Sequence, residues 1–111
     1  MTRVTPYSNE PPDRTGIDAM PGLVALEFGT DWCGHCQGAQ AFLQPALAAR
    51  PDVRHFRVED GPGRPLGRSF KVKLWPTLVL LRDGVEVARV VRPATRDDVD
   101  AALDLLGPPV E

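Results

Sequence analysis

Two cysteines, Cys33 and Cys36, are the only ones among the 111 residues, and they stand in the stretch TDWCGHCQG. Just before them, residues 23–28 read LVALEF, an almost unbroken apolar run that is typical of a strand buried on both faces. After them, apolar residues recur at helical spacing from position 34 to about 49. The cysteine pair therefore lies where a buried strand gives way to an amphipathic helix.

Three further elements follow along the chain. Residues 53–59 alternate in polarity and predict a second strand, and Pro65 can start a short helix after a glycine-rich loop. Residues 77–81 (TLVLL) and 85–91 (VEVARVV) predict two strands, and they flank Asp83-Gly84, a dipeptide that favours a two-residue hairpin. This order predicts a parallel strand pair followed by an antiparallel hairpin.

The two ends of the chain carry different signals. Thr95 and Asp98 form a variant of a capping box before a helix that Gly107 ends. The first twenty residues are rich in proline and have room for only a short strand and a short helix. Strand, helix, strand, short helix, hairpin and helix together predict the α/β class, with a mixed sheet and helices on both faces.

Composition places the chain among ordinary globular proteins. Hydrophobic residues make up 42% and charged residues 25%, and the net charge of −2 gives no indication of nucleic acid or an acidic membrane as a partner. There is no apolar run of membrane-spanning length and no secretory signal at the start, so we expect one cytoplasmic domain over residues 1–111. Eleven arginines against two lysines indicate a GC-rich, bacterial coding sequence.

The residues alone leave three interpretations of the cysteine pair. A structural disulfide is disfavoured, because a three-residue separation constrains the unfolded chain very little. A zinc site needs four ligands, and only His35 and His55 stand beside the cysteines, unless two chains share a cluster. A redox couple fits the helix start, where backbone N–H groups favour a thiolate at Cys33 while Cys36 lies one turn deeper.

The surroundings of the pair resemble the thioredoxin superfamily. WCGHC after a buried strand, Trp75-Pro76-Thr77 about forty residues later and the DG hairpin carry this resemblance, which covers residues 23–106. The resemblance implies a thioredoxin-like fold with a mixed central sheet, and CGHC is similar to the motif of protein disulfide isomerase domains. It makes Cys33 the nucleophile and Cys36 the resolving thiol.

Other site residues follow from the same resemblance. Trp32 is similar to the aromatic residue beside the nucleophile, and Pro76 to a cis-proline that presents the backbone of Trp75 to an extended substrate. Glu27 resembles the buried acid that takes the proton of the resolving thiol. It interrupts an apolar strand, and a pKa raised toward neutrality suits a general base. His55 lies where the family often has a basic partner for this acid, although an exposed histidine is an equally good interpretation.

Three positions depart from the family pattern, and His35 is a further candidate residue of the site. Trp75 stands where a smaller aliphatic residue is common, Arg92 where a glycine lets partners approach, and Pro45 later in its helix than usual. Pro45 is expected to kink or end that helix. His35, between the cysteines, is expected to stabilise the Cys33 thiolate, unless its ring points into solvent.

The resemblance implies a thiol–disulfide oxidoreductase. It would act on protein or small-molecule disulfides, receive electrons from a reductase, need no cofactor beyond its own dithiol, and work as a monomer. A second hypothesis is a binding module of the same fold that holds a partner on Trp32, Trp75 and Pro76 without turnover. A metal-binding protein is the third.

Overall fold

The computed structural model describes residues 5–108. Four strands form one sheet, in which β1 (Leu23–Gly29) runs parallel to β2 (Arg54–Glu59) and antiparallel to β3 (Thr77–Arg82). The strand β4 (Val85–Val91) pairs with β3 in an antiparallel hairpin, so the order across the sheet is β2-β1-β3-β4. The mixed sheet and the order of elements predicted from the sequence are confirmed.

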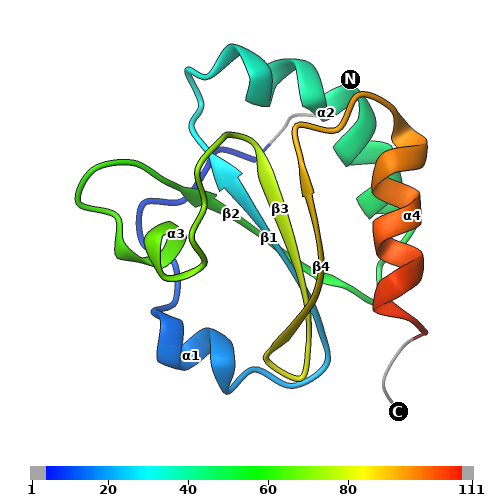
Figure 1. The fold of residues 1–111 in the computed structure, drawn as a ribbon, viewed down its shortest axis with the longest axis horizontal. Coiled ribbons are helices and arrows are strands. Elements are labelled where there is room, and N and C mark those ends of the chain that lie inside the picture. Colours follow the sequence, from blue (N-terminus) through cyan, green and yellow to red (C-terminus); the bar gives the residue numbers. More distant parts are fainter. Residues whose placement is uncertain (1–4, 109–111) are drawn as a thin grey trace.

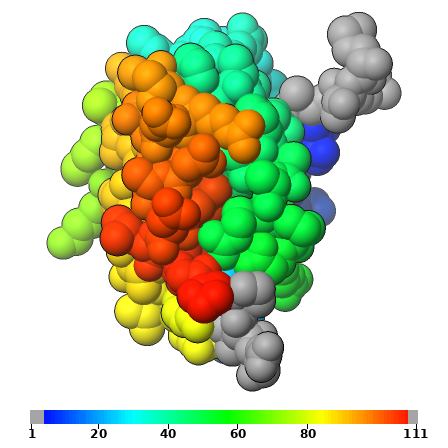
Figure 2. Space-filling model, turned by 90° about the vertical axis from the view of Figure 1, so that its right-hand side faces the viewer, coloured from blue at the N-terminus to red at the C-terminus, as the bar shows by residue number. Residues whose placement is uncertain are grey.

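Helices cover both faces of this sheet (Figure 1). The helices α2 (Gly34–Ala48) and α4 (Arg96–Leu106) lie on one face, and the short helices α1 (Arg14–Asp18) and α3 (Pro65–Ser69) lie on the other. Figure 2 looks onto α4, drawn in orange to red, which packs alongside α2.

The alternation of side chains along β1 divides the core into two layers. Leu23 and Ala25 point toward α2 and α4, whereas Val24, Leu26 and Phe28 point toward α1 and α3. Every residue of β1 is buried, which explains its continuous apolar run. Glu27 shares the face of Leu23 and Ala25, and is therefore directed toward α2.

Local details confirm some expectations and correct others. The capping box at Thr95 and Asp98 is present. Pro45 lies inside α2 and does not end it, since the helix continues for three more residues. The expected N-terminal strand is reduced to a single bridge between Ser8 and Val58, followed by α1. Among residues 5–108, no helix is long and apolar enough to cross a membrane.

Candidate active site at the start of α2

The cysteine pair lies at the carboxyl end of β1, where the chain turns into α2 (Figure 1). Cys33 is itself the N-cap residue, because its Sγ accepts a hydrogen bond from the backbone N–H of Cys36 at 3.2 Å. Asp31, a residue type that commonly caps helices, instead accepts a hydrogen bond from the backbone N–H of Tyr7 at 3.1 Å. A sulfur atom thus occupies the position where a helix start favours negative charge.

The two thiols differ in exposure as the sequence predicted, although both are largely buried. Cys33 is 8% exposed and Cys36 only 1%. Both are free thiols. Burial is the main reason that the pKa of Cys36 is raised to about 12, and the hydrogen bond with Cys33 adds to the effect. A thiol with such a pKa needs help to lose its proton before it can attack.

Two indoles lie beside the cysteines. Trp32 is 73% exposed, and its ring meets that of Trp75 edge to face with centroids 5.8 Å apart. Trp75 also packs against the cysteine pair, and its Nε1–H donates to Asp60 Oδ2 at 2.8 Å. The Trp75–Pro76 peptide bond is cis, as the resemblance implied.

Arg92 is tied to this same loop by two hydrogen bonds. Its backbone N–H donates to the Pro76 carbonyl at 3.0 Å, and its Nε–H donates to the Trp75 carbonyl at 2.8 Å. Its φ of 49° lies in the left-handed region that favours glycine. The Trp75 carbonyl oxygen is therefore already hydrogen-bonded to the side chain of Arg92.

Glu27 is completely buried. Its Oε1 lies 2.9 Å from His55 Nε2. Its Oε2 accepts hydrogen bonds from three other side chains, which are those of Tyr7 at 2.5 Å, Gln40 at 2.9 Å and Arg57 at 3.1 Å. Both carboxylate oxygens are therefore fully engaged.

These partners reverse the expected direction of the shift in the Glu27 pKa. Burial alone would raise this pKa, as the sequence argument assumed. The hydrogen bond with His55 and the positive charge of Arg57 outweigh burial and lower the pKa to about 2. The expectation of a pKa near neutrality is therefore wrong, and Glu27 is a carboxylate throughout the physiological pH range.

Tyr7 connects this carboxylate to the resolving cysteine. A methyl group built onto Gly29 would lie 2.6 Å from Cys36 Sγ and 2.8 Å from the Tyr7 oxygen, so both atoms flank the same small space. Burial and the charge of Glu27 raise the pKa of Tyr7, which therefore keeps its proton. Tyr7 therefore touches both Glu27 and the cysteine cluster, and Gln40 also links the two, since its Nε2 donates to Glu27 Oε2 at 2.9 Å and to the Cys36 carbonyl at 2.8 Å.

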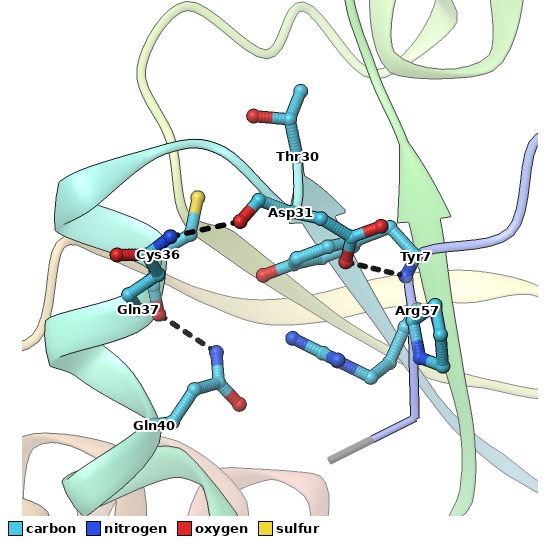
Figure 3. Close-up of a pocket in the computed structure, with 8 residues that line it drawn as sticks. Tyr7, Thr30, Asp31, Cys36, Gln37, Gln40 and Arg57 are labelled. Atoms are coloured by element: carbon cyan, nitrogen blue, oxygen red, sulfur yellow. Dashed lines mark hydrogen bonds between the residues drawn. The ribbon is translucent and has the colours of Figure 1, made fainter.

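A pocket of about 310 Å³ opens beside these groups, and Figure 3 shows it. Tyr7 and Arg57 line one side of it, while Cys36, Gln37 and Gln40 line the other from α2. Cys36 therefore lines this pocket, although only 1% of it is exposed.

Arg57 and Tyr7 were missed in the sequence. The alternation in residues 53–59 places Arg57 on the same side as His55, and Arg57 is the register partner of Glu27 in the parallel pair. That periodicity was a usable signal. Tyr7 lies in a proline-rich segment without periodicity, and nothing in the sequence connects it with position 27.

His35 is exposed in the first turn of α2, and no side-chain hydrogen bond is recorded for it within residues 5–108. His55 is engaged with Glu27 rather than with the cysteines. Over the same described part of the chain, no group of three or more His, Cys, Asp and Glu side chains is placed to hold a metal ion.

This fold, with a CxxC pair at the start of α2 beside a cis-proline, defines a thiol–disulfide oxidoreductase. The thioredoxin family model matches residues 12–104. The chain belongs to the thioredoxin family.

Individual relatives agree with this assignment. The structure of thioredoxin 2 from Pseudomonas aeruginosa PAO1 in its reduced form is 57% identical and superposes with a TM-score of 0.84, covering 93% of this chain and 96% of that one. The thioredoxin of Chlamydia pneumoniae is 36% identical over 63% of this chain and 69% of its own length. The thioredoxin of Chlamydia trachomatis serovar D is 35% identical over 70% of this chain and 76% of its own length.

Proposed function

We propose that this protein reduces disulfides of proteins or small molecules through a cycle of Cys33 and Cys36. The Cys33 thiolate attacks one substrate sulfur, a mixed disulfide forms, and the other substrate sulfur leaves and takes up a proton. Cys36 then loses its proton and attacks Cys33 Sγ, which releases the second substrate thiolate. Two electrons pass to the substrate, and the Cys33–Cys36 disulfide remains. The observation that carries this proposal is the less buried Cys33 at the helix start, above the more buried Cys36.

The second step requires removal of the Cys36 proton, and Glu27 assists it through Tyr7. The Tyr7 hydroxyl accepts the thiol proton and passes its own proton to Glu27 Oε2, to which it is already hydrogen-bonded. Because the pKa of Glu27 is low, the carboxylate does not keep this proton. The pocket beside Tyr7 and Cys36 gives it a route to solvent.

Substrate is held around the cis-proline loop. Trp32 offers an exposed apolar surface, and the backbone of Trp75 and Pro76 pairs with an extended substrate segment. Arg92 competes for the Trp75 carbonyl and adds charge, so it restricts which reductases and substrates can dock. His35, although exposed, lies in the first turn of α2, and it acts on the Cys33 thiolate through the charge or dipole of its ring rather than through a hydrogen bond.

The cellular setting follows from the relatives and the composition. Residues 1–111 act as a single domain and as a monomer in a bacterial cytoplasm, where a reductase returns the disulfide to the dithiol. Bacterial thioredoxins among the relatives support this setting.

Insulin reduction with dithiothreitol as electron donor tests the proposal. The wild type should accelerate precipitation of the insulin B chain, and Cys33→Ser should abolish the acceleration. A wild-type protein that binds disulfide proteins without accelerating insulin reduction would support the binding module instead. Metal analysis of the purified protein addresses the third hypothesis.

A further inference from the structure

A further concave site, of about 530 Å³, is lined by Trp75, which also packs against the cysteine pair. Its walls come from the loop after β2, from α3 and from the loop that leads to the cis-proline (Figure 1). Four cationic side chains line it, together with Trp75 and one acid, Asp60. The cations are Arg64, Arg68, Lys71 and Lys73. We call this site the basic cleft.

The basic cleft is positively charged, whereas the whole chain has a negative net charge. Lys71 and Lys73 are the only lysines of a protein whose net charge is −2. Arg64 is paired with Glu59 at 2.6 Å, but within residues 5–108 no acidic partner is recorded for Arg68, Lys71 or Lys73. All three are exposed. Three uncompensated cations therefore face solvent in one cleft.

A defined turn presents these cations. The backbone N–H of Lys71 donates to the Arg68 carbonyl at 2.9 Å, and Lys71 has a φ of 57°. The carboxylate of Asp60 accepts the Trp75 indole N–H, and within residues 5–108 it forms no ion pair with the four cations, so its single negative charge offsets only part of their positive charge. The turn thus holds the positive groups on the same side of the molecule.

The basic cleft is continuous with the redox site through one indole. Trp75 packs against the cluster that contains Cys33 and Cys36, and it also lines the cleft. Because the same indole contacts the cysteines and lines the cleft, a polypeptide bound to Cys33 that crosses Trp75 would run into the cleft. The position of the cleft suits a substrate segment next to the reacting cysteine.

We propose that the basic cleft binds an acidic segment of the disulfide substrate, located a few residues from the cysteine that Cys33 attacks. This inference rests on the proposed reductase function. Exposed ion pairs are individually weak, and the cleft therefore acts through several of them together, by favouring encounter with acidic partners over neutral or basic ones. The preference weakens as salt screens the charges.

Peptide disulfides of matched sequence test this proposal. Each peptide carries four Asp, four Asn or four Lys residues on one side of its reactive cysteine. Every composition is made in two versions, with the four residues before the cysteine or after it. At low salt the reduced wild type should react with one of the Asp peptides at least about fivefold faster than with its Asn counterpart, and more slowly with the Lys peptide. Raising the salt concentration should shrink both differences.

Two double variants of equal net charge test whether the preference for the Asp peptide arises in the basic cleft. K71Q/K73Q should bring the Asp-to-Asn rate ratio close to one. R54Q/R96Q removes two exposed arginines that do not line the cleft, and it should keep the wild-type ratio. Equal loss of the ratio in both variants would show an effect of net charge alone and would overturn the proposal.

A binding measurement separates this inference from the proposed function. Fluorescence anisotropy of the labelled Asp peptide with C33S/C36S should show binding that K71Q/K73Q weakens about fivefold or more. If the wild type reduces the Asn peptide but shows no preference for either Asp peptide, the cleft proposal fails and the reductase stands. If no peptide is reduced but the Asp peptide still binds at the lysines, the reductase proposal fails instead.

Discussion

Replacing Glu27 by Gln should destabilise the protein strongly, because the carboxylate is the charge partner of a buried arginine. The Arg57 side chain is only 7% exposed and lies 3.1 Å from Glu27. Removing one partner of a buried pair costs about 3–5 kcal/mol, since the remaining charge is left uncompensated. A similar size follows from the pKa, which falls from 4.5 to about 2 and corresponds to ~3 kcal/mol at about 1.4 kcal/mol per unit.

Urea denaturation of the reduced protein measures this effect. A loss of ~3 kcal/mol should lower the midpoint by roughly 1–3 M urea, given typical slopes of about 1–3 kcal/mol per M. The double variant E27Q/R57M removes both charges and should recover much of the loss. An E27Q variant as stable as the wild type would refute the argument that Arg57 depends on this carboxylate.

The Glu27–Arg57 pair also predicts how the stability difference between the wild type and E27Q depends on pH. The pKa of Glu27 is lower in the folded state than in the unfolded chain, so its stabilising contribution is fully present above about pH 4.5. It is lost as the pH falls toward 2, when the folded state must also take up the proton. The stability gap between the wild type and E27Q should therefore close over that range. A gap that stays constant from neutral pH to pH 2 would assign the stabilisation to packing.

Three further substitutions test single side chains. Tyr7→Phe should slow resolution of a mixed disulfide about tenfold or more while leaving its formation by Cys33 nearly unchanged, as stopped-flow kinetics with a chromogenic disulfide would show; equal slowing of both steps would contradict the relay. His35→Pro should make the redox potential more negative by tens of millivolts, from a wild-type value less reducing than the ~−270 mV of thioredoxin; equilibration with glutathione measures this, and an unmoved potential would show that His35 contributes nothing. Arg92→Gly should improve recycling by a bacterial thioredoxin reductase in a coupled NADPH assay; efficient recycling of the wild type would remove the idea that Arg92 restricts partners.

The sequence was sufficient for the elements whose pattern is local. The buried strand β1, the helix after Cys33 and the hairpin at Asp83-Gly84 each carry their signal within about ten residues, through periodicity or turn chemistry. The unusual position of Glu27 could also be recognised from the sequence, because it is the one polar residue in an apolar strand.

The environment of Glu27 could not be predicted from the sequence, since it depends on contacts between distant segments. Arg57 comes from a neighbouring strand, and Tyr7 approaches across the end of the sheet, so no local pattern reports their charge and hydrogen bonds. Without them, burial was the only known influence on the Glu27 pKa, and the expected direction was wrong. The cap at Cys33 was missed for a related reason, because a sulfur acceptor is not a usual capping group.

The most direct test of the central account is the fate of a chromogenic disulfide, 5,5′-dithiobis(2-nitrobenzoate), on the wild type and on two serine variants. The wild type should release both thionitrobenzoate groups and retain none, because Cys36 resolves the adduct on Cys33. Cys36→Ser should release one group quickly and keep the other as a stable adduct that mass spectrometry locates on Cys33. Cys33→Ser should react slowly. Rapid formation of a stable adduct on Cys36 in Cys33→Ser, or retention of the label by the wild type, would contradict the assignment of attacking and resolving thiols.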